Sequence, residues 1–306
     1  MNELTKPLAG IKVLDISRVL AGPWCGQMLA DMGADVIKVE RPGSGDDTRH
    51  WGPPWLAGSE ESAYYLCANR GKRSLTVDMA KPEGQAVIKQ LVANSDVLIE
   101  NFKVGGLKRY GLDYASLKAL NPRLIYCSIT GFGQESPYAH RAGYDFMIQA
   151  MGGIMSLTGK PDSEPGGGPV KSGVAFTDIF TGLYAANAIL AALYQRRDSS
   201  EGCHIDMALM DVQVGVLANQ ALNYLTSGNV PQRLGNAHPN IVPYQAFATQ
   251  DGHMIMAVGN DEQFKRFCAV LSLPALAEDP RFATNGARVN NRALLVPQLE
   301  AALAQR

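Results

Sequence analysis

The sequence predicts an α/β protein with a parallel sheet wrapped by helices, followed by a smaller α+β domain. Short runs rich in branched residues alternate with helical patterns over residues 11–133, which is typical of βαβ units. Beyond residue 230, two alternating apolar runs flank "QDG", which indicates a β-hairpin. A chain of 306 residues that is 46% hydrophobic can bury one large core or two unequal ones. We therefore expect two domains, residues 1–225 and 226–306.

The first half of the chain predicts a strand and a helix in regular alternation. Ile11–Ser17 is rich in branched residues, as buried strands are, and the following apolar residues recur at helical spacing as far as Gly33. Further strands are expected at 35–40, 96–102 and 124–133, and helices at 81–95 and 116–122. Pro82 suits the first turn of its helix.

The pattern changes from about Gly143. Helices are expected at 144–153 and 178–196, separated by the Gly/Pro-rich loop 160–169. Residues 203–225 predict a strand followed by one long apolar helix, and 242–259 predict the hairpin. Helical patterns continue to the end, where "LEAALAQR" stops inside one, so we expect the small domain to be incomplete at its C-terminus.

The bulk properties exclude several classes of protein. A net charge of −1 with scattered Lys and Arg gives no electrostatic footprint for nucleic acid or a membrane surface. The five cysteines contain no CxxC pair, which fits a reducing compartment. The N-terminus lacks the layout of a signal peptide, and no uninterrupted apolar run approaches the roughly 20 residues of a membrane span. We expect a cytoplasmic protein.

Common catalytic and cofactor motifs are missing. The chain has no GxxxxGK[ST] loop, and "GFGQES" supplies only two of the three glycines of a dinucleotide fingerprint. The five histidines show no metal-ligand spacing, so no metal site is expected. No GxSxG elbow is present, which argues against an α/β-hydrolase.

Basic and amide side chains gather near the ends of predicted strands: Arg41, the segment 69–74, the segment 100–102 and Arg109. In an open parallel sheet, ligands bind beyond the carboxyl ends of the strands. These residues are either solvated loop charges or a site for a nucleotide-sized anion, with guanidinium groups on its phosphates.

Asp178 stands alone at the head of an uncharged, small-residue helix. One interpretation is a helix N-cap, which Asp fills well. The other is a covalent nucleophile whose carboxylate the helix start keeps ionised. The two interpretations are compatible. Gly182 and Ala186 would let another backbone or a ligand approach this helix, although simple helix packing explains them equally well.

Several segments together resemble the class III CoA-transferases, the CaiB/BaiF family that includes formyl-CoA transferase. They are the N-terminal stretch 7–49, "NRGKRSLTVDM", "IENF", "YCSITGFGQESPYAHRAGYD" and "TDIFTGLYAANAILAAL". "RLGNAHPNIVPYQAFATQDG" looks most like the succinate–hydroxymethylglutarate (glutarate) CoA-transferase branch. The resemblance implies a Rossmann-like large domain, a small domain, and two chains interlocked as rings. In a complete member, the C-terminal part returns to the large domain.

The resemblance also implies roles for individual residues. Asp178 falls on the nucleophilic aspartate. CoA contacts fall on Leu20, Ala21, Arg41, Val77, Asn101, Phe102, Lys103, Arg109, Ala142, Tyr144 and Asp145. His238, Asn240 and Tyr244 are candidates for holding the acyl substrate, or alternatively belong to an inter-domain loop.

Three departures from relatives narrow the function. Leu20 stands where formyl-CoA transferase has a glutamine, and "AHPNIVPY" stands where that enzyme has a glycine run. Tyr144 stands where the α-methylacyl-CoA racemases have a histidine. A racemase needs a base for the α-proton, so Tyr144 favours transferase over racemase.

We therefore expect a homodimeric transferase that moves CoA from an acyl-CoA to a carboxylic acid, such as a dicarboxylic acid, through an aspartyl anhydride and an aspartyl-CoA thioester. CoA is then a substrate, and no permanently bound cofactor is required. The alternatives are a racemase-type enzyme, which would exchange an α-proton, and a non-catalytic CoA-binding protein, which would form no adduct at Asp178.

Overall fold

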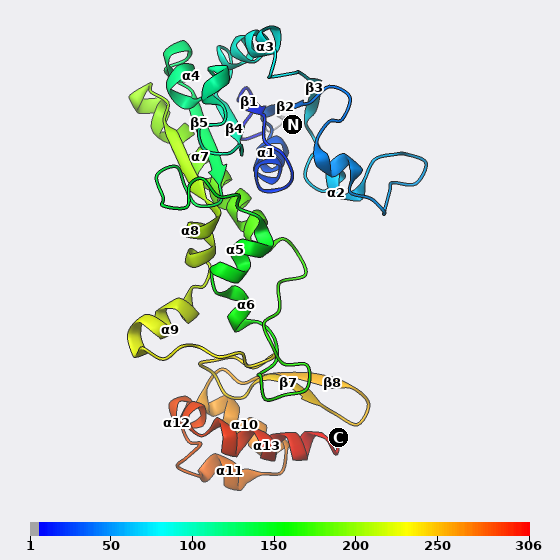
Figure 1. Cartoon of the computed structure of the whole chain (residues 1–306). Coiled ribbons are helices and arrows are strands. Elements are labelled where there is room, and N and C mark those ends of the chain that lie inside the picture. The colour runs from blue at the N-terminus through cyan, green and yellow to red at the C-terminus, as the bar shows by residue number, and fades with distance from the viewer. Residues whose placement is uncertain (1–5) are drawn as a thin grey trace, which may run out of the picture. The chain divides into compact units, whose positions relative to one another are not determined.

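The structure is a computed structural model that describes residues 6–306, so the first five residues of the chain lie outside it. The chain forms two compact units (Figure 1). The first holds the residues up to Ile154 together with Ser172–Thr226, and the second holds Met155–Lys171 and Ser227–Arg306. Along the chain, the first unit ends at Ile154, which is also the first residue of helix α6 (Ile154–Leu157).

The first unit is built on a six-stranded, fully parallel sheet whose strands lie in the order β3-β2-β1-β4-β5-β6. This is the doubly wound Rossmann order, which reverses direction between β1 and β4. The α/β class and parallel sheet predicted from the sequence are thus confirmed. The strands are β1 (Lys12–Asp15), β2 (Asp35–Glu40), β3 (Arg73–Thr76), β4 (Val97–Glu100), β5 (Ile125–Thr130) and β6 (His204–Ala208).

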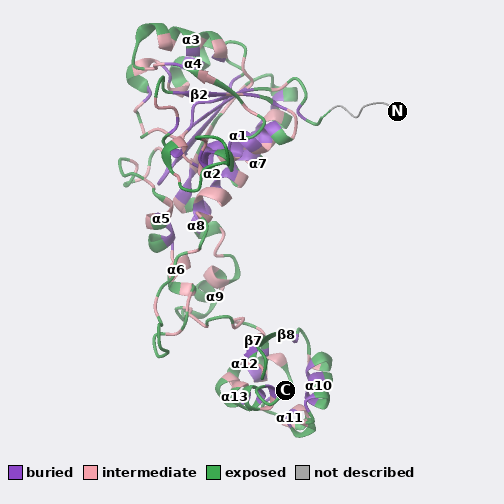
Figure 2. Ribbon diagram, turned by 90° about the vertical axis from the view of Figure 1, so that its right-hand side faces the viewer, coloured by how far each residue is buried: buried purple, intermediate pink, exposed green. Residues whose placement is uncertain are grey.

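Helices cover both faces of this sheet because its strands are apolar on both faces. Val13 packs with α1 (Ala21–Asp31) and α7 (Phe176–Ser199), whereas its neighbour Leu14 packs with α3 (Pro82–Val92) and α4 (Tyr114–Leu120). Buried residues therefore concentrate in the sheet and on the inner faces of α1 and α7 (Figure 2). Helices α5 (Asp145–Met151) and α8 (Leu209–Gly215) pack beside α7.

Small residues let α7 approach α1 closely. A Cβ added to Gly182 would lie 2.8 Å from the Ala21 carbonyl oxygen and 3.0 Å from a ring carbon of Trp24. By length and hydropathy alone, α7 is also long and apolar enough to cross a membrane, which the sequence analysis did not predict. The packing of α7 against α1, β5 and β6 is that of a core helix.

The sequence missed or misjudged several elements. Strand β3 was not predicted; its residues are mostly exposed, as expected at the edge of the sheet. The long helix expected after β6 is wrong, because Ala218 adopts φ 48° and separates α8 from α9 (Asn219–Ser227). Four short elements were also not anticipated, namely α2 (Ala63–Leu66), α6 and the 3₁₀ helices η1 (Asp47–His50) and η2 (Lys108–Tyr110).

The second unit contains the predicted hairpin, β7 (Tyr244–Ala248) paired antiparallel with β8 (His253–Ala257). Phe247, Phe264 and Phe282 join leucines of the last helix in its core. Arg288 is fully buried there, where it donates to the carbonyls of Val242 and Phe282 and to Asp261. The helices are α10 (Asp261–Val270), α11 (Pro274–Glu278), α12 (Asn285–Asn290) and α13 (Arg292–Leu303).

Candidate active site

A pocket of about 710 Å³ opens at the carboxyl edge of the parallel sheet, beyond β1, β2, β3 and β4. Ligands of doubly wound folds bind at this edge, where the strand order reverses. Five residues predicted to contact CoA line the pocket: Arg41, Val77, Phe102, Lys103 and Arg109. The fold thus gathers residues that are up to 68 positions apart in the sequence around one cavity.

Positive charge in this pocket is available to a ligand. The side chains of Arg41, Lys103 and Arg109 are exposed, and none of them forms an ion pair with another described residue. Arg18 lies over the ring of Phe102, 5.1 Å from its centroid, and pairs with Asp47 at 3.6 Å. Guanidinium and ammonium groups free of carboxylate partners suit a phosphate-bearing ligand.

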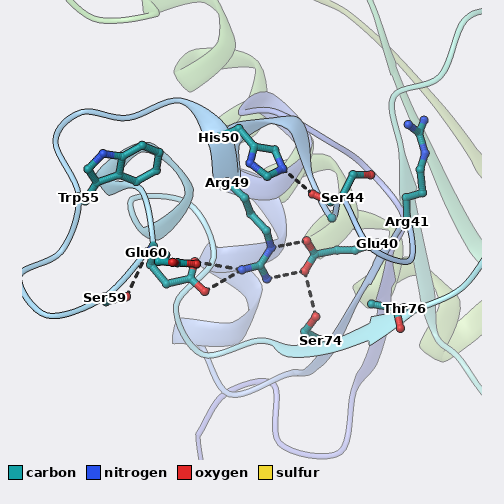
Figure 3. Close-up of a pocket in the computed structure, with 13 residues that line it drawn as sticks. Glu40, Arg41, Ser44, Arg49, His50, Trp55, Ser59, Glu60, Ser74 and Thr76 are labelled. Carbon is teal, nitrogen blue, oxygen red and sulfur yellow. Dashed lines mark hydrogen bonds and ion pairs between the residues drawn. The ribbon is translucent and has the colours of Figure 1, made fainter.

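A neighbouring pocket of about 680 Å³ has a different character (Figure 3). Its central cation, Arg49, already binds Glu40 through two bonds of 2.7 and 2.8 Å and Glu61 at 2.9 Å. Burial raises the pKa of Glu40, but the bonds from Arg49 and the Asp46 backbone outweigh it and lower the pKa to about 2. Because Arg49 is neutralised, this pocket suits an anion less well than its neighbour does.

Asp178 is the third residue of α7, so it does not cap the helix. The N-cap position is Ala175, and the cap interpretation made from the sequence is wrong. The expectation that the helix start keeps the carboxylate ionised is wrong too. Burial, together with the negative charge of Asp145, raises the pKa of Asp178 to about 7. Neither carboxylate has an ion-pair partner among the described residues.

Asp145 takes the capping role that the sequence reading gave to Asp178. Its Oδ1 accepts from the backbone N–H of Thr177 at 2.8 Å and of Asp178 at 3.3 Å, while its Oδ2 accepts from Gln149 at 2.7 Å. Asp145 was predicted as a CoA contact; that role stays a prediction. A cap supplied by another helix 32 residues away leaves no local sequence signal, since capping motifs lie within a few residues of the helix.

The loop that carries Asp145 is held against the end of β5. An added Cβ on Gly131 would lie 2.4 Å from the Gly143 Cα, and one on Gly143 would lie 2.1 Å from the Gly131 Cα. Only two glycines permit this approach. The predicted contacts Ala142 and Tyr144 flank Gly143 on the same loop and are exposed, Tyr144 to 74%.

The sequence reading did not single out Tyr64, which the structure brings close to Asp178. Burial and the negative charge of Asp178 raise the pKa of the Tyr64 hydroxyl to about 12. Its ring packs edge-on against Trp51 at 5.0 Å between centroids. Tyr64 lies on α2, an element too short to give a pattern, so nothing in the sequence pointed to it.

The remaining predicted CoA contacts are Leu20 and Ala21, at the start of α1, and Asn101, which follows β4 and contacts the turn before α1. Leu20 is the N-cap residue of α1 and Ala21 its first residue, and both are buried. Asn101 uses its side-chain amide on the backbone of Arg18, accepting from the N–H at 2.8 Å and donating to the carbonyl at 2.6 Å. Direct contact of these three residues with CoA stays a prediction.

The candidates for binding the acyl group lie together in the second unit. The Nδ1 atom of His238 accepts from the N–H of Asn240 at 3.1 Å, and the N–H of His238 donates to the Tyr244 carbonyl at 2.9 Å. The rings of His238 and Tyr244 lie 5.4 Å apart. The three residues therefore form one local cluster, and their role with the acyl substrate stays a prediction.

A pocket lined by basic side chains without ion pairs and an unneutralised carboxylate on α7 are features that suit an enzyme acting on a phosphate-bearing substrate. The chain belongs to CoA-transferase family III, whose profile matches residues 8–306. It is 60% identical over 290 residues to a succinate–glutarate CoA-transferase of Agrobacterium fabrum, covering 94% of this chain and 72% of that enzyme. It is 48% identical to the human succinyl-CoA:glutarate CoA-transferase, covering 97% of this chain and 66% of the human protein.

Solved structures agree with this assignment. A CAIB/BAIF family protein from Brucella suis has a TM-score of 0.85 and 59% identity, over 99% of this chain and 79% of that one. A protein from Mycobacterium tuberculosis has a TM-score of 0.87 and 35% identity, over 99% of this chain and 79% of that one. The family and fold resemblances inferred from the sequence are confirmed.

Proposed function

We propose that this protein transfers CoA from succinyl-CoA to glutarate or a related dicarboxylic acid, with Asp178 as the nucleophile. The observation that carries the proposal is the state of Asp178: burial and a second carboxylate raise its pKa to about 7, and no described cation neutralises it. A carboxylate that is poorly stabilised in its own site is a more reactive nucleophile than a salt-bridged one. The names of the similar CoA-transferases support the choice of substrates.

The proposed reaction exchanges bonds without a net change in protons. A carboxylate oxygen of Asp178 attacks the thioester carbonyl, the C–S bond breaks, and a succinyl-aspartyl anhydride and CoA thiolate form. The thiolate attacks the aspartyl carbonyl and releases succinate. Glutarate then attacks the aspartyl-CoA thioester, giving a glutaryl-aspartyl anhydride, and the returning thiolate takes the glutaryl group and frees Asp178. The energy of the thioester stays on covalent intermediates throughout.

The first turn of α7 does not supply donors for the oxyanion in this scheme. The N–H groups of Thr177 and Asp178 donate to Asp145, and those of Phe176 and Ile179 donate to backbone carbonyls. These four N–H groups of the described helix start are therefore already engaged and are not free for the oxyanion. Donors from another element are required.

The remaining parts of the proposal follow the family resemblance. The pocket at the sheet edge holds the nucleotide part of CoA through Arg41, Lys103 and Arg109. His238, Asn240 and Tyr244 hold the far carboxylate of the acyl group. The enzyme acts as a homodimer in the cytoplasm, and CoA enters only as a substrate.

Trapping of the intermediate tests the proposed function. The protein is incubated with succinyl-CoA and then hydroxylamine, and peptides are searched by mass spectrometry for a hydroxamate at Asp178. Asp178→Asn should abolish the adduct, whereas Asp198→Asn, on an exposed position of the same helix, should leave it unchanged. Binding of CoA without an adduct would contradict the proposal. Exchange of the α-proton of an acyl-CoA in D₂O without CoA transfer would point to a racemase instead.

A further inference from the structure

The turn between β1 and α1 contains a strained residue. Val19 adopts φ 69°, in the left-handed region that β-branched side chains rarely occupy. It directly precedes Leu20 and Ala21, where α1 begins. Such strain persists only where the surroundings over-determine the backbone, and it gathers at functional sites.

Side chains from four positions fix the backbone of this turn. Five consecutive polar groups, from the N–H of Ser17 to the N–H of Val19, are bonded to side chains rather than to other backbone. The bonds are Ser17 N–H to Asp15 at 3.0 Å, Lys38 to the Ser17 carbonyl at 2.8 Å, Arg18 N–H to Asn101 at 2.8 Å, Asn101 to the Arg18 carbonyl at 2.6 Å, and Val19 N–H to both oxygens of Asp46 at 3.3 and 3.4 Å.

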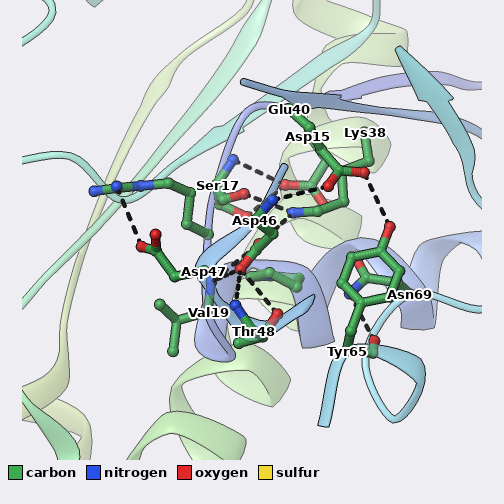
Figure 4. A network of polar contacts seen from close by, with 12 residues as sticks. Asp15, Ser17, Val19, Lys38, Glu40, Asp46, Asp47, Thr48, Tyr65 and Asn69 are labelled. Atoms are coloured by element: carbon green, nitrogen blue, oxygen red, sulfur yellow. Dashed lines mark hydrogen bonds and ion pairs between the residues drawn. The ribbon is translucent and has the colours of Figure 1, made fainter. Parts of the chain in front are cut away.

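Asp46 is itself held rigidly (Figure 4). Its side chain is buried and pairs at 2.9 Å with Lys38, which is also buried. Its Oδ1 accepts from both the N–H and the hydroxyl of Thr48, and its own N–H donates to Glu40 at 2.9 Å. A carboxylate with so many partners cannot follow Val19 if the turn relaxes, so it acts as a fixed acceptor.

The turn connects the pocket to the helix of the proposed nucleophile. Ile16 and Arg18, on one side of it, line the pocket at the sheet edge. Ala21, on the other side, is in close contact with Gly182, which lies four residues beyond Asp178 on the same face of α7. The conformation of Val19 therefore sets where the pocket wall ends and where the first turn of α1 meets α7.

We propose that Asp46 and Asn101 are positioning residues for the reaction at Asp178: they hold the Arg18–Val19 turn in its strained conformation and so align the bound thioester with α7. This inference rests on the proposed function. It assigns Asn101 to the backbone of Arg18, and it gives the buried Lys38–Asp46 pair a task beyond stability.

The main test compares Asp46→Ala with the same variant carrying Val19→Gly. The single variant should lower kcat about tenfold to a hundredfold, the range for a small misplacement of reacting groups, with a smaller change in KM for succinyl-CoA. Glycine adopts a positive φ without help. Val19→Gly should therefore restore most of the lost kcat, whereas Val230→Gly, at an exposed loop position of the second unit, should restore none.

A second variant guards against a failure of Asp46→Ala to fold. Asn101→Ala removes both bonds to Arg18 without leaving a buried charge unpaired, and its loss of kcat should be rescued by Val19→Gly in the same way. Unchanged kcat in either single variant, or failure of Val19→Gly to restore it while Tm is normal, would overturn the inference.

Hydrogen exchange separates this inference from the proposed function. In both single variants the amides of residues 18–22 should exchange faster, while those of β1 and β4 stay protected. This measurement needs no turnover, so it tests whether Asp46 and Asn101 hold the Arg18–Val19 turn even if no adduct forms at Asp178. If the enzyme is active and the amides of residues 18–22 exchange at the same rate in wild type and variants, the positioning role of Asp46 and Asn101 is refuted. The proposed function would still stand.

Discussion

The carboxylate of Asp15, which is paired with lysine, and the half-buried carboxylates of Asp145 and Asp178 have opposite electrostatic environments. Asp15 is fully buried, and burial alone would raise its pKa, but Lys72 at 2.8 Å and the nearby Lys38 outweigh burial and lower it. Asp178 faces Asp145 with no described cation between them, and its pKa rises to about 7. Asp15 helps to fix the turn before α1. Asp178, in contrast, is a carboxylate whose ionised form is poorly stabilised, at the position where the chemistry is proposed. The neutralised charge stabilises the scaffold, and the unneutralised charge lies at the proposed reacting position.

The largest expected effect comes from removing the unneutralised carboxylate. Asp178→Asn should lower kcat for CoA transfer by about 10³- to 10⁶-fold, the range for loss of a covalent nucleophile, because the amide cannot form the anhydride. Steady-state transfer from succinyl-CoA to glutarate measures it. Asp198→Asn should retain wild-type kcat, and an Asp178→Asn variant with more than a tenth of the wild-type rate would refute the nucleophile.

Removing the cation that neutralises Asp15 should lower the stability of the protein rather than its activity. Lys72→Met leaves Asp15 buried without its nearest cation and should lower the free energy of unfolding by about 3–5 kcal/mol. Urea denaturation measures this change. Arg73→Met is the matched control, because Arg73 pairs with Asp35 at the exposed surface and its loss should change stability by less than about 1 kcal/mol. Equal losses from the two variants would contradict the contrast.

The same contrast predicts that Asp178→Asn stabilises the protein at high pH. Because the folded state raises the pKa of Asp178 above its usual 3.8, ionising it opposes folding. This cost grows as the pH rises from about 4 to about 7 and is constant above. The variant should therefore gain roughly 1–3 kcal/mol at pH 8, with solvent screening of the partly exposed group included, and less at pH 5. A gain in the free energy of unfolding that does not depend on pH would contradict the raised pKa of Asp178.

The pH profile of kcat/KM offers a finer comparison. The rate should rise tenfold per pH unit below about 7 and level off above, as Asp178 ionises in the free enzyme. Asp145→Asn removes the neighbouring charge and should move the midpoint lower. Glu100, whose pKa burial also raises to about 7, could produce the same profile, so Glu100→Gln is the control and should leave the midpoint in place.

The smallest expected effect concerns the pocket. Arg109→Ala should raise KM for succinyl-CoA about fivefold to tenfold and leave kcat within twofold, because an exposed cation contributes to binding of the nucleotide but not to the reacting atoms. Lys108→Ala is the neighbouring control, since Lys108 is exposed but does not line the pocket. Equal effects of the two variants would place the nucleotide elsewhere.

The sequence predicted those parts of the structure that local patterns encode. Branched runs gave five of the strands of the sheet, and positions near their ends gave Arg41, Phe102 and Arg109 in the pocket. Val77 and Lys103 came only from the family resemblance. The sequence could not show β3, whose residues are mostly exposed and lack an apolar run. Nor could it show that Asp145 caps α7 or that Asn101 bonds to the backbone of Arg18. The bonded residues lie 32 positions apart in the first case and 83 in the second. Propensity describes neighbours along the chain, whereas these contacts depend on the sheet bringing distant loops together.

The composition of the second unit has a consequence for how the chain is made. Residues 155–171 belong to that unit, but 55 residues of the first unit, 172–226, must be synthesised before the rest of it begins. Arg233, which bonds to the carbonyls of Ser156 and Lys160, lies 62 residues beyond Lys171. At about 5–20 residues per second, the early segment therefore waits roughly 3–12 s for it. Until then, residues 155–171 lack the contacts that they make in the folded second unit, which leaves this stretch open to proteases or chaperones.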